Sequence, residues 1–186
     1  PLVFNQIELS ATQIGKGLAA AAVAGTLFRL ITGRLLDRGT NSAIALRIAI
    51  LIAICSDIAF LNAQDFKIFL IGQILLGSAA GLYWPSVELA VPASCGDFPS
   101  SKGFALVRSA DALGTSIGVL FGSFTALIGA IRSIYVIDLS CMIYLLFLLA
   151  KITIKDKRAE LVASLKRSKS IQRNSNWILT LLPILF

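Results

Sequence analysis

Residues 42–62 have the sequence SAIALRIAILIAICSDIAFLN, in which Arg47 and Asp57 are the charged side chains. A helix needs about 20 mostly apolar residues to cross the ~30 Å hydrocarbon core of a bilayer. This run has that length, and it lacks the strict alternation of apolar and polar residues that is typical of a barrel strand. The stretch therefore predicts a membrane-spanning helix.

Four further runs have the same character, and short polar connectors separate them. Short connectors require the chain to cross the membrane alternately upward and downward. The sequence thus predicts an all-α protein, a polytopic transmembrane helix bundle with five spans. The other four spans are predicted over Gly15–Leu36, Ile68–Ala93, Phe104–Leu127 and Ser133–Ala150.

The composition of the 186 residues supports a membrane protein and excludes several classes of enzyme. The hydrophobic fraction is 56%, and 15% of the residues are charged, against about 25% in soluble chains. Because the chain has no histidine, Ser-His-Asp triads and His-ligated metals are excluded. Cys55, Cys95 and Cys141 form no CxxC pair, so we expect no metal or redox role and no cofactor. Without histidine, only paired carboxylates such as Glu88 and Asp111 could serve in catalysis, and both fit a gate better, so we expect no enzymatic activity.

The basic residues predict the orientation. The first, third and fifth runs end at the same face of the membrane. Eleven Lys and Arg residues lie at that face, and three lie at the opposite face. Cytoplasmic loops carry such an excess, so residues 151–176 are predicted to be cytoplasmic. The net charge of +7 therefore reflects orientation rather than nucleic-acid binding. Residues 151–176 form either a solvated linker or a basic amphipathic helix on anionic lipid.

Charged residues inside the apolar runs are costly in a membrane and are candidates for function. Asp and Glu are too short to reach the headgroups well, so Glu88 and Asp111 are expected to face protein or a water-filled cavity. Arg108 and Asp111 are three residues apart and can pair on one helix face, either as a static pair or as part of a gate. The full set is Arg29, Arg47, Asp57, Glu88, Arg108, Asp111 and Asp138.

Two of the predicted helices carry polar and small residues at three- and four-residue spacing. Small residues at this spacing let helix backbones approach closely, and polar groups on the same stripe can line a solute path. Pro85 and Pro92 are expected to kink or loosen the third span. The stripe on the third span contains Gln73, Gly77, Gly81, Trp84 and Glu88, and that on the fourth contains Arg108, Asp111, Thr115, Gly118 and Gly122.

The end of the first span carries a recognisable motif, Gly33-Arg-Leu-Leu-Asp37-Arg38-Gly39. It resembles the signature of the major facilitator superfamily, Gly-x-x-x-Asp-Arg-x-Gly-Arg-Arg. One residue is missing before Gly39, and Thr40 and Asn41 replace the basic pair.

Two later stretches resemble further patterns of that family, in the correct order. Gln73-Ile-Leu-Leu-Gly77 is similar to the fourth-helix pattern Arg-x-x-x-Gly, with glutamine in place of arginine. The segment Gly114-Thr-Ser-Ile-Gly118-Val119-Leu-Phe-Gly122-Ser123 is similar to the fifth-helix pattern Gly-x-x-x-Gly-Pro-x-x-Gly-Gly, which is associated with antiporters. Val119 and Ser123 depart from it, which argues against antiport.

The resemblance implies the organisation of the chain. Residues 1–150 would be an incomplete N-terminal transmembrane half of a twelve-helix transporter, containing helices two to six. Residues 151–176 would be the cytoplasmic linker between the halves, and residues 177–186 the start of the next transmembrane helix. The chain would thus be a fragment of a longer polypeptide.

The resemblance also implies roles for individual residues. The gate motif would be Gly33, Asp37, Arg38 and Gly39, with Asp37 and Arg38 holding the cytoplasmic side closed. Cavity or coupling residues would be Arg29, Gln73, Trp84, Glu88, Arg108 and Asp111, with Glu88 and Asp111 as proton carriers, and helix-packing residues would be Gly77, Gly81, Gly114, Gly118 and Gly122. Asp57 and Asp138 would lie on helices outside the central cavity.

The predicted function is secondary active transport of a small solute by alternating access, with the proton as one candidate for the coupling ion. The alternative is a non-transporting membrane sensor or assembly protein on the same scaffold. Expected partners are the lipid bilayer, a small-molecule solute, protons and the C-terminal half of the same chain, but no nucleic acid. The expected location is the cell membrane, inner or plasma, as a multi-pass protein.

Overall fold

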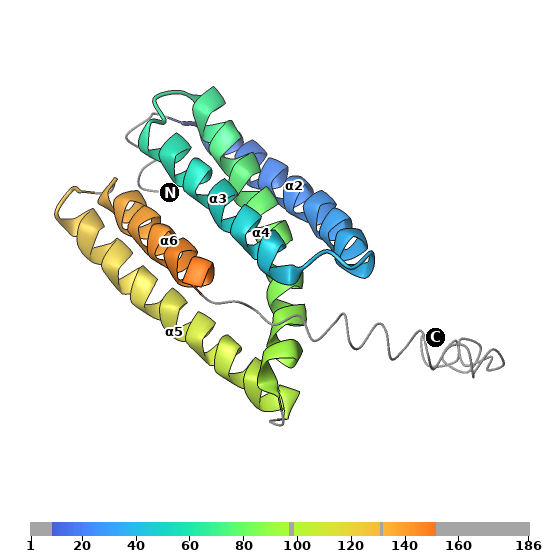
Figure 1. The fold of residues 1–186 in the computed structure, drawn as a ribbon. Helices are drawn as coiled ribbons and strands as arrows, with labels where there is room; N and C mark the ends of the chain where they lie inside the picture. The colour runs from blue at the N-terminus through green and yellow to red at the C-terminus, as the bar shows by residue number, and fades with distance from the viewer. Residues whose placement is uncertain (1–8, 97–98, 131, 152–186) are drawn as a thin grey trace, which may run out of the picture. The chain divides into compact units, whose positions relative to one another are not determined.

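The computed structural model describes residues 9–96, 99–130 and 132–151, and this part of the chain is helical and contains no strand (Figure 1). Each of the five helices is long and apolar enough to cross a membrane. The predicted all-α fold and the five spans are therefore confirmed. The helices are α2 (Ala11–Asp37), α3 (Ser42–Leu61), α4 (Phe66–Cys95), α5 (Ser100–Leu127) and α6 (Ser133–Lys151).

Most of the helices extend beyond the predicted apolar runs, because polar caps set where they begin. Ser10 and Gln13 form a reciprocal capping box that starts α2. The Asn41 side chain accepts a hydrogen bond from the Ala43 N–H at 2.7 Å, and Asp65 accepts one from the Ile68 N–H at 2.8 Å. Hydropathy identifies the segment that matches the lipid, whereas the caps satisfy the free N–H groups at the true helix ends.

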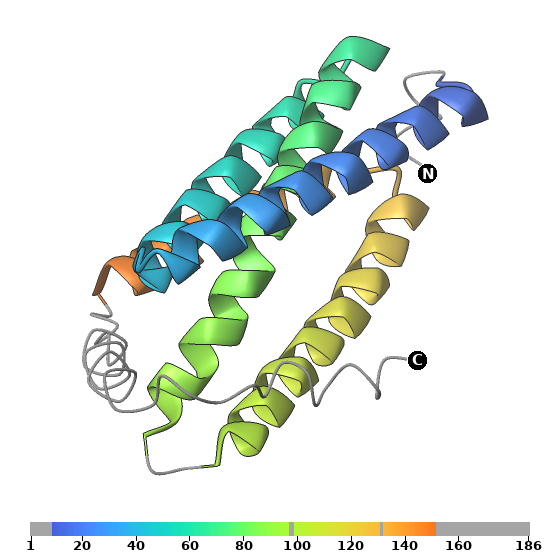
Figure 2. The same cartoon turned by 90° about the vertical axis from the view of Figure 1, so that its right-hand side faces the viewer.

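The helix α4 lies at the centre of the packing. It contacts α2 on one side and α3 on the other, and α3 also packs against α6 (Figures 1 and 2). The contacts of α5 with its neighbours are close at Gly103, which lies against Cys95 of α4, and near Gly122, which faces Ile134 of α6. Figure 2 shows α5 running beside the other helices with a gap along most of its length.

Two glycines allow α2 and α4 to pack backbone to backbone. A Cβ on Gly77 would collide with the carbonyl of Ala21, and one on Gly81 would collide with that of Gly25. Small residues commonly permit this approach between membrane helices. The α2–α4 contact is therefore built on the stripe that also carries Trp84 and Glu88.

The helix α4 continues through Pro85 and Pro92. Proline lacks an N–H and its ring clashes with the preceding turn, so it bends a helix without necessarily ending it. In Figure 1 the second half of α4, in light green, turns away from the direction of the first half. The bend directs the end of α4 toward α5.

Several predicted segments lie outside the described residues. These are the cytoplasmic linker over residues 151–176, apart from Lys151, and the start of a further helix over residues 177–186.

Candidate functional site

A polar pocket of about 490 Å³ lies between α2, α4 and α5. Four of its lining residues belong to the predicted cavity set, and Gly33 belongs to the predicted gate motif. The lining residues are Arg29, Gly33, Trp84, Pro85, Glu88 and Arg108.

An ion pair crosses this pocket from α5 to α4. Nη2 of Arg108 lies 3.5 Å from Oε1 of Glu88, and the side chains are 56% and 55% exposed, respectively. The Arg108 guanidinium carbon also lies 4.5 Å from the centre of the Trp84 ring, a distance at which a cation is attracted to the ring face. Arg108 therefore connects two residues of α4 that are one helical turn apart.

The charges in the pocket do not balance. Arg29 and Arg108 contribute two positive charges, and Glu88 contributes one negative charge. No carboxylate of the described residues forms an ion pair with Arg29. The pocket thus has an excess positive charge on its α2 side.

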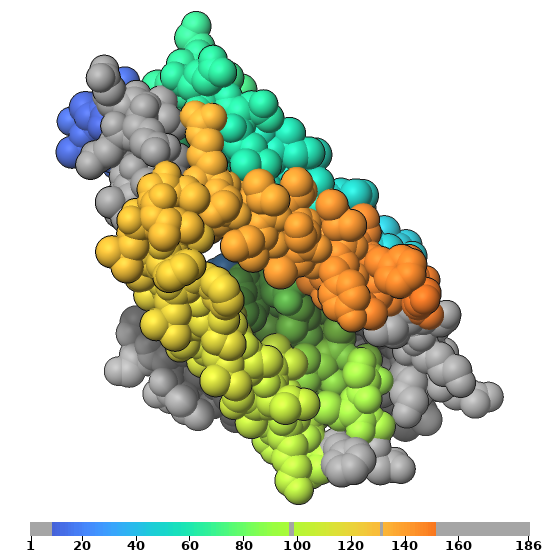
Figure 3. All heavy atoms as spheres, turned by 90° about the vertical axis from the view of Figure 1, so that its left-hand side faces the viewer, coloured from blue at the N-terminus to red at the C-terminus, as the bar shows by residue number. Residues whose placement is uncertain are grey.

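Trp84 belongs to a second pocket as well. This pocket of about 250 Å³ is lined by α3, α4 and α6, mainly by apolar side chains, and includes Tyr83 and Met142. Figure 3 shows a hollow in the surface between α5 and α6, with α4 behind it. Trp84 therefore contributes to both a polar and an apolar pocket.

Two predicted cavity residues do not line the polar pocket. Gln73 is only 5% exposed, and its side chain lies against Gly17 of α2. Asp111 is exposed on α5 and interacts electrostatically with Tyr83. Arg108 and Asp111 can pair by their spacing, but in this structure the Arg108 guanidinium pairs with Glu88 on the neighbouring helix.

The predicted gate motif forms the end of α2. The Gly39 N–H donates to the Leu36 carbonyl at 3.0 Å, and the Thr40 N–H donates to the Leu35 carbonyl at 3.1 Å. Gly39 has a φ of +97°, so this is a Schellman helix end with its usual glycine. Asp37 and Arg38 are exposed beside it.

The glycines of α5 differ from those of α4. A Cβ on Gly114 or Gly118 would meet no atom within 4 Å, and one on Gly122 would lie 3.9 Å from Ile134. Within the described residues, Gly114 and Gly118 therefore do not pack against another helix. The α5 face that carries them is open.

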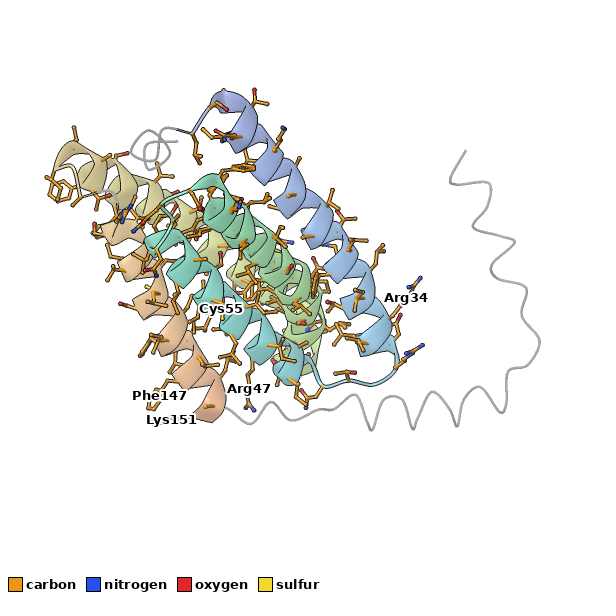
Figure 4. All side chains as sticks on the ribbon, turned by 90° about the horizontal axis from the view of Figure 1, so that it is seen from above. Arg34, Arg47, Cys55, Phe147 and Lys151 are labelled. Carbon is orange, nitrogen blue, oxygen red and sulfur yellow. The ribbon has the colours of Figure 1, made fainter. Side chains whose placement is uncertain are left out.

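Basic side chains gather at one end of the helices. Arg47 Nη2 of α3 donates to the Leu149 carbonyl of α6 at 2.8 Å, and Lys151 lies 4.3 Å from the centre of the Phe147 ring. Figure 4 shows Arg34, Arg47 and Lys151 at this end, where α2 and α6 finish and α3 begins. It is the end predicted to face the cytoplasm.

Asp57 is a buried charged residue outside the predicted cavity set. This side chain lies in α3, is only 3% exposed, and has an Oδ2 atom that is buried without a hydrogen-bond partner. Asp57 belongs to the charged residues found inside the apolar runs, which is the signal in the sequence. The resemblance implies that its helix lies outside the central cavity, so it was not among the predicted cavity residues.

Comparison with known families decides the classification. A family model described as Major Facilitator Superfamily matches residues 1–186. The chain belongs to the major facilitator superfamily. No curated protein and no solved structure matches it.

Membership explains the exposed apolar surface of this major facilitator protein. The side chains of Leu106, Leu120 and Leu127 on α5 are 73%, 70% and 85% exposed, as expected of helices that contact lipid or further transmembrane helices. The chain is an integral, multi-pass membrane protein of a transporter family.

Proposed function

We propose that this chain is part of a secondary active transporter that moves a small solute by alternating access, and that the polar pocket is its cytoplasmic gate. In such carriers two halves rock around a central site, so that the solute is exposed to one side at a time. The family match supports transport in general. The pair formed by Glu88 and Arg108 across the pocket supports the gate.

The position of the pair fits a gate near one membrane surface. Arg29 and Glu88 lie eight and seven residues before the ends of α2 and α4, and Arg108 lies eight residues after the start of α5. At 1.5 Å per residue all three are about 10–12 Å from those ends. The distribution of Lys and Arg assigns this side to the cytoplasm.

The strength of the pair also fits a gate. An ion pair between side chains that are about half exposed contributes only about 0–1 kcal/mol to stability. Such a pair holds α4 and α5 together in one state and separates in another at little cost. The Arg108 guanidinium also lies over the Trp84 ring, and this attraction requires the same side-chain position of Arg108.

Glu88 is also our first candidate for proton coupling. Its carboxylate lines the polar pocket and pairs there with Arg108, so a change in this pair would change the charge that the pocket presents. Asp111 is the second candidate, because it lies one helical turn from Arg108 on α5. We assign the protein to the cell membrane, plasma or inner.

The test uses the complete transporter in proteoliposomes and a screen of small solutes by mass spectrometry. We expect Glu88→Gln and Arg108→Gln each to reduce uptake of the transported solute at least tenfold. The exchanged variant Glu88→Arg/Arg108→Glu should recover part of the uptake. Lys67→Gln is the matched control, because Lys67 is an exposed cation outside the pocket.

Two results would contradict the proposal. Uptake that is unchanged in both single variants would remove the pair from the gate. Absence of any transported solute, with signalling or assembly intact in the neutralised variants, would favour the sensor or assembly protein on the same scaffold.

A further inference from the structure

A second group of acidic side chains lies far from the polar pocket, where α3 meets α6. Asp57 is four residues before the end of α3, about 6 Å along the helix axis. Its side chain is 97% removed from solvent, and Oδ2 has no hydrogen-bond donor. A buried carboxylate oxygen without a donor is unfavourable while it is ionised.

The nearest acidic partner comes from α6. Asp138 is half-buried and close enough to Asp57 to repel it electrostatically. Tyr135, one helical turn earlier on α6, also interacts electrostatically with Asp57, and its ring stacks on Phe60 with the ring centres 5.1 Å apart. The packing of α3 on α6 therefore places two carboxylates and a phenol at one contact.

The cations of the described residues do not form an ion pair with either carboxylate. Arg132 donates to the carbonyls of Leu61 and Ala63 at the end of α3 and forms no ion pair with Asp57 or Asp138. On α4, Gly72 accepts a hydrogen bond from Ser56, next to Asp57, and the charged Lys67 is exposed. The neighbouring Asp65 caps α4, and α5 has no charged residue after Asp111.

Two adjacent carboxylates in a poorly solvated contact cannot both remain ionised easily, because each opposes the charge of the other. One bound cation relieves this repulsion. The described residues contain no group of three or more side chains that could hold a metal ion. A proton is the cation that two carboxyl groups can bind without further ligands.

We propose that Asp57 and Asp138 form a proton-binding site between α3 and α6, in which the two carboxyl groups hold one proton between them. The proton comes from water at the end of α3 away from Arg47, because Asp57 lies four residues before that end. With the proton bound, the pair carries a single negative charge, and the unpaired Oδ2 of Asp57 acquires either a proton or a donor. Release of this proton returns it to water and restores two negative charges, which separates α3 from α6. The site is independent of the gate formed by Glu88 and Arg108.

The test is infrared difference spectroscopy of the complete protein, with isotope-labelled aspartate to identify the bands. The wild-type protein should show the C=O band of one protonated aspartic acid at neutral pH. Asp57→Asn should abolish this band at neutral pH. Asp138→Asn should weaken the band at neutral pH, because the repulsion that favours binding of the proton is gone. Asp65→Asn is the control, because asparagine caps α4 as well as aspartate does and the residue is exposed.

A second measurement needs no variant. The midpoint of thermal unfolding of the wild-type protein should fall as the pH rises through the titration of the band, because loss of the proton places two negative charges at the α3–α6 contact. The proposal is overturned if the wild-type protein lacks a protonated aspartic acid at neutral pH, or if the wild-type band persists unchanged in Asp57→Asn or in Asp138→Asn. Loss of the band on adding sodium at constant pH would assign the site to sodium and overturn the proton assignment.

Discussion

Arg108 of α5 lies 3.5 Å from Glu88 of α4, and the two charged groups face each other across the pocket that Arg29 also lines. The same guanidinium rests on Trp84, so one side chain of α5 makes both contacts with α4. The interaction joins helices that also touch closely near Gly103, which lies against Cys95. It is therefore placed where a change in the angle between α4 and α5 would break it.

The pair should matter more for transport than for stability. Because both side chains are more than half exposed, we expect Glu88→Gln to lower the free energy of unfolding by less than about 1 kcal/mol. Thermal unfolding in detergent measures this change beside the uptake assay. A loss of several kcal/mol would indicate a structural pair instead of a gate.

Asp37 should be needed for transport. A carboxylate at the C-terminal end of its own helix is opposed by that helix's dipole, so its contribution must come from contacts outside α2. We expect Asp37→Asn in the complete protein to stop solute uptake while membrane insertion remains normal. Surface expression and uptake, measured together, check this; undiminished uptake would remove Asp37 from the mechanism.

The glycines of α4 and α5 should respond in opposite directions to alanine. Gly77→Ala adds a Cβ that collides with the backbone of α2, and overpacking of this kind costs about 1–3 kcal/mol. Gly114→Ala adds a Cβ in open space, so the better helix propensity of alanine should stabilise α5 by about 0.5–1 kcal/mol. Unfolding midpoints of the two variants distinguish these effects. Equal destabilisation would show that Gly114 packs against a helix in the complete protein.

The end of α2 should require glycine at position 39, because the backbone there has a positive φ. Its φ of +97° lies in the region that side chains with a Cβ rarely adopt, so Gly39→Ala should cost about 1 kcal/mol. Gly39→Asn should cost less, because asparagine tolerates left-handed conformations at helix ends. Thermal unfolding of both variants measures the difference, and equal losses would mean that the side-chain volume matters instead of φ.

The amino-acid sequence by itself determined the number of helices and their positions. Runs such as Ser42–Asn62 have the length and apolarity that a bilayer demands, and a helix satisfies every backbone group internally. These requirements depend on local composition, so they can be recognised in the sequence without knowledge of any tertiary contact. The motif ending at Gly39 was sufficient to suggest the family, and the family match confirmed it.

Only the tertiary structure decided which charges meet. Arg108 and Asp111 share a helix face, yet Arg108 pairs with Glu88, because the partner depends on how α5 is rotated and how α4 bends at its prolines. Burial of Asp57 likewise depends on α6 covering that side of α3. A helix repeat reports which residues share a face, but a contact between helices also requires their relative rotation and distance, which come from packing over the whole bundle.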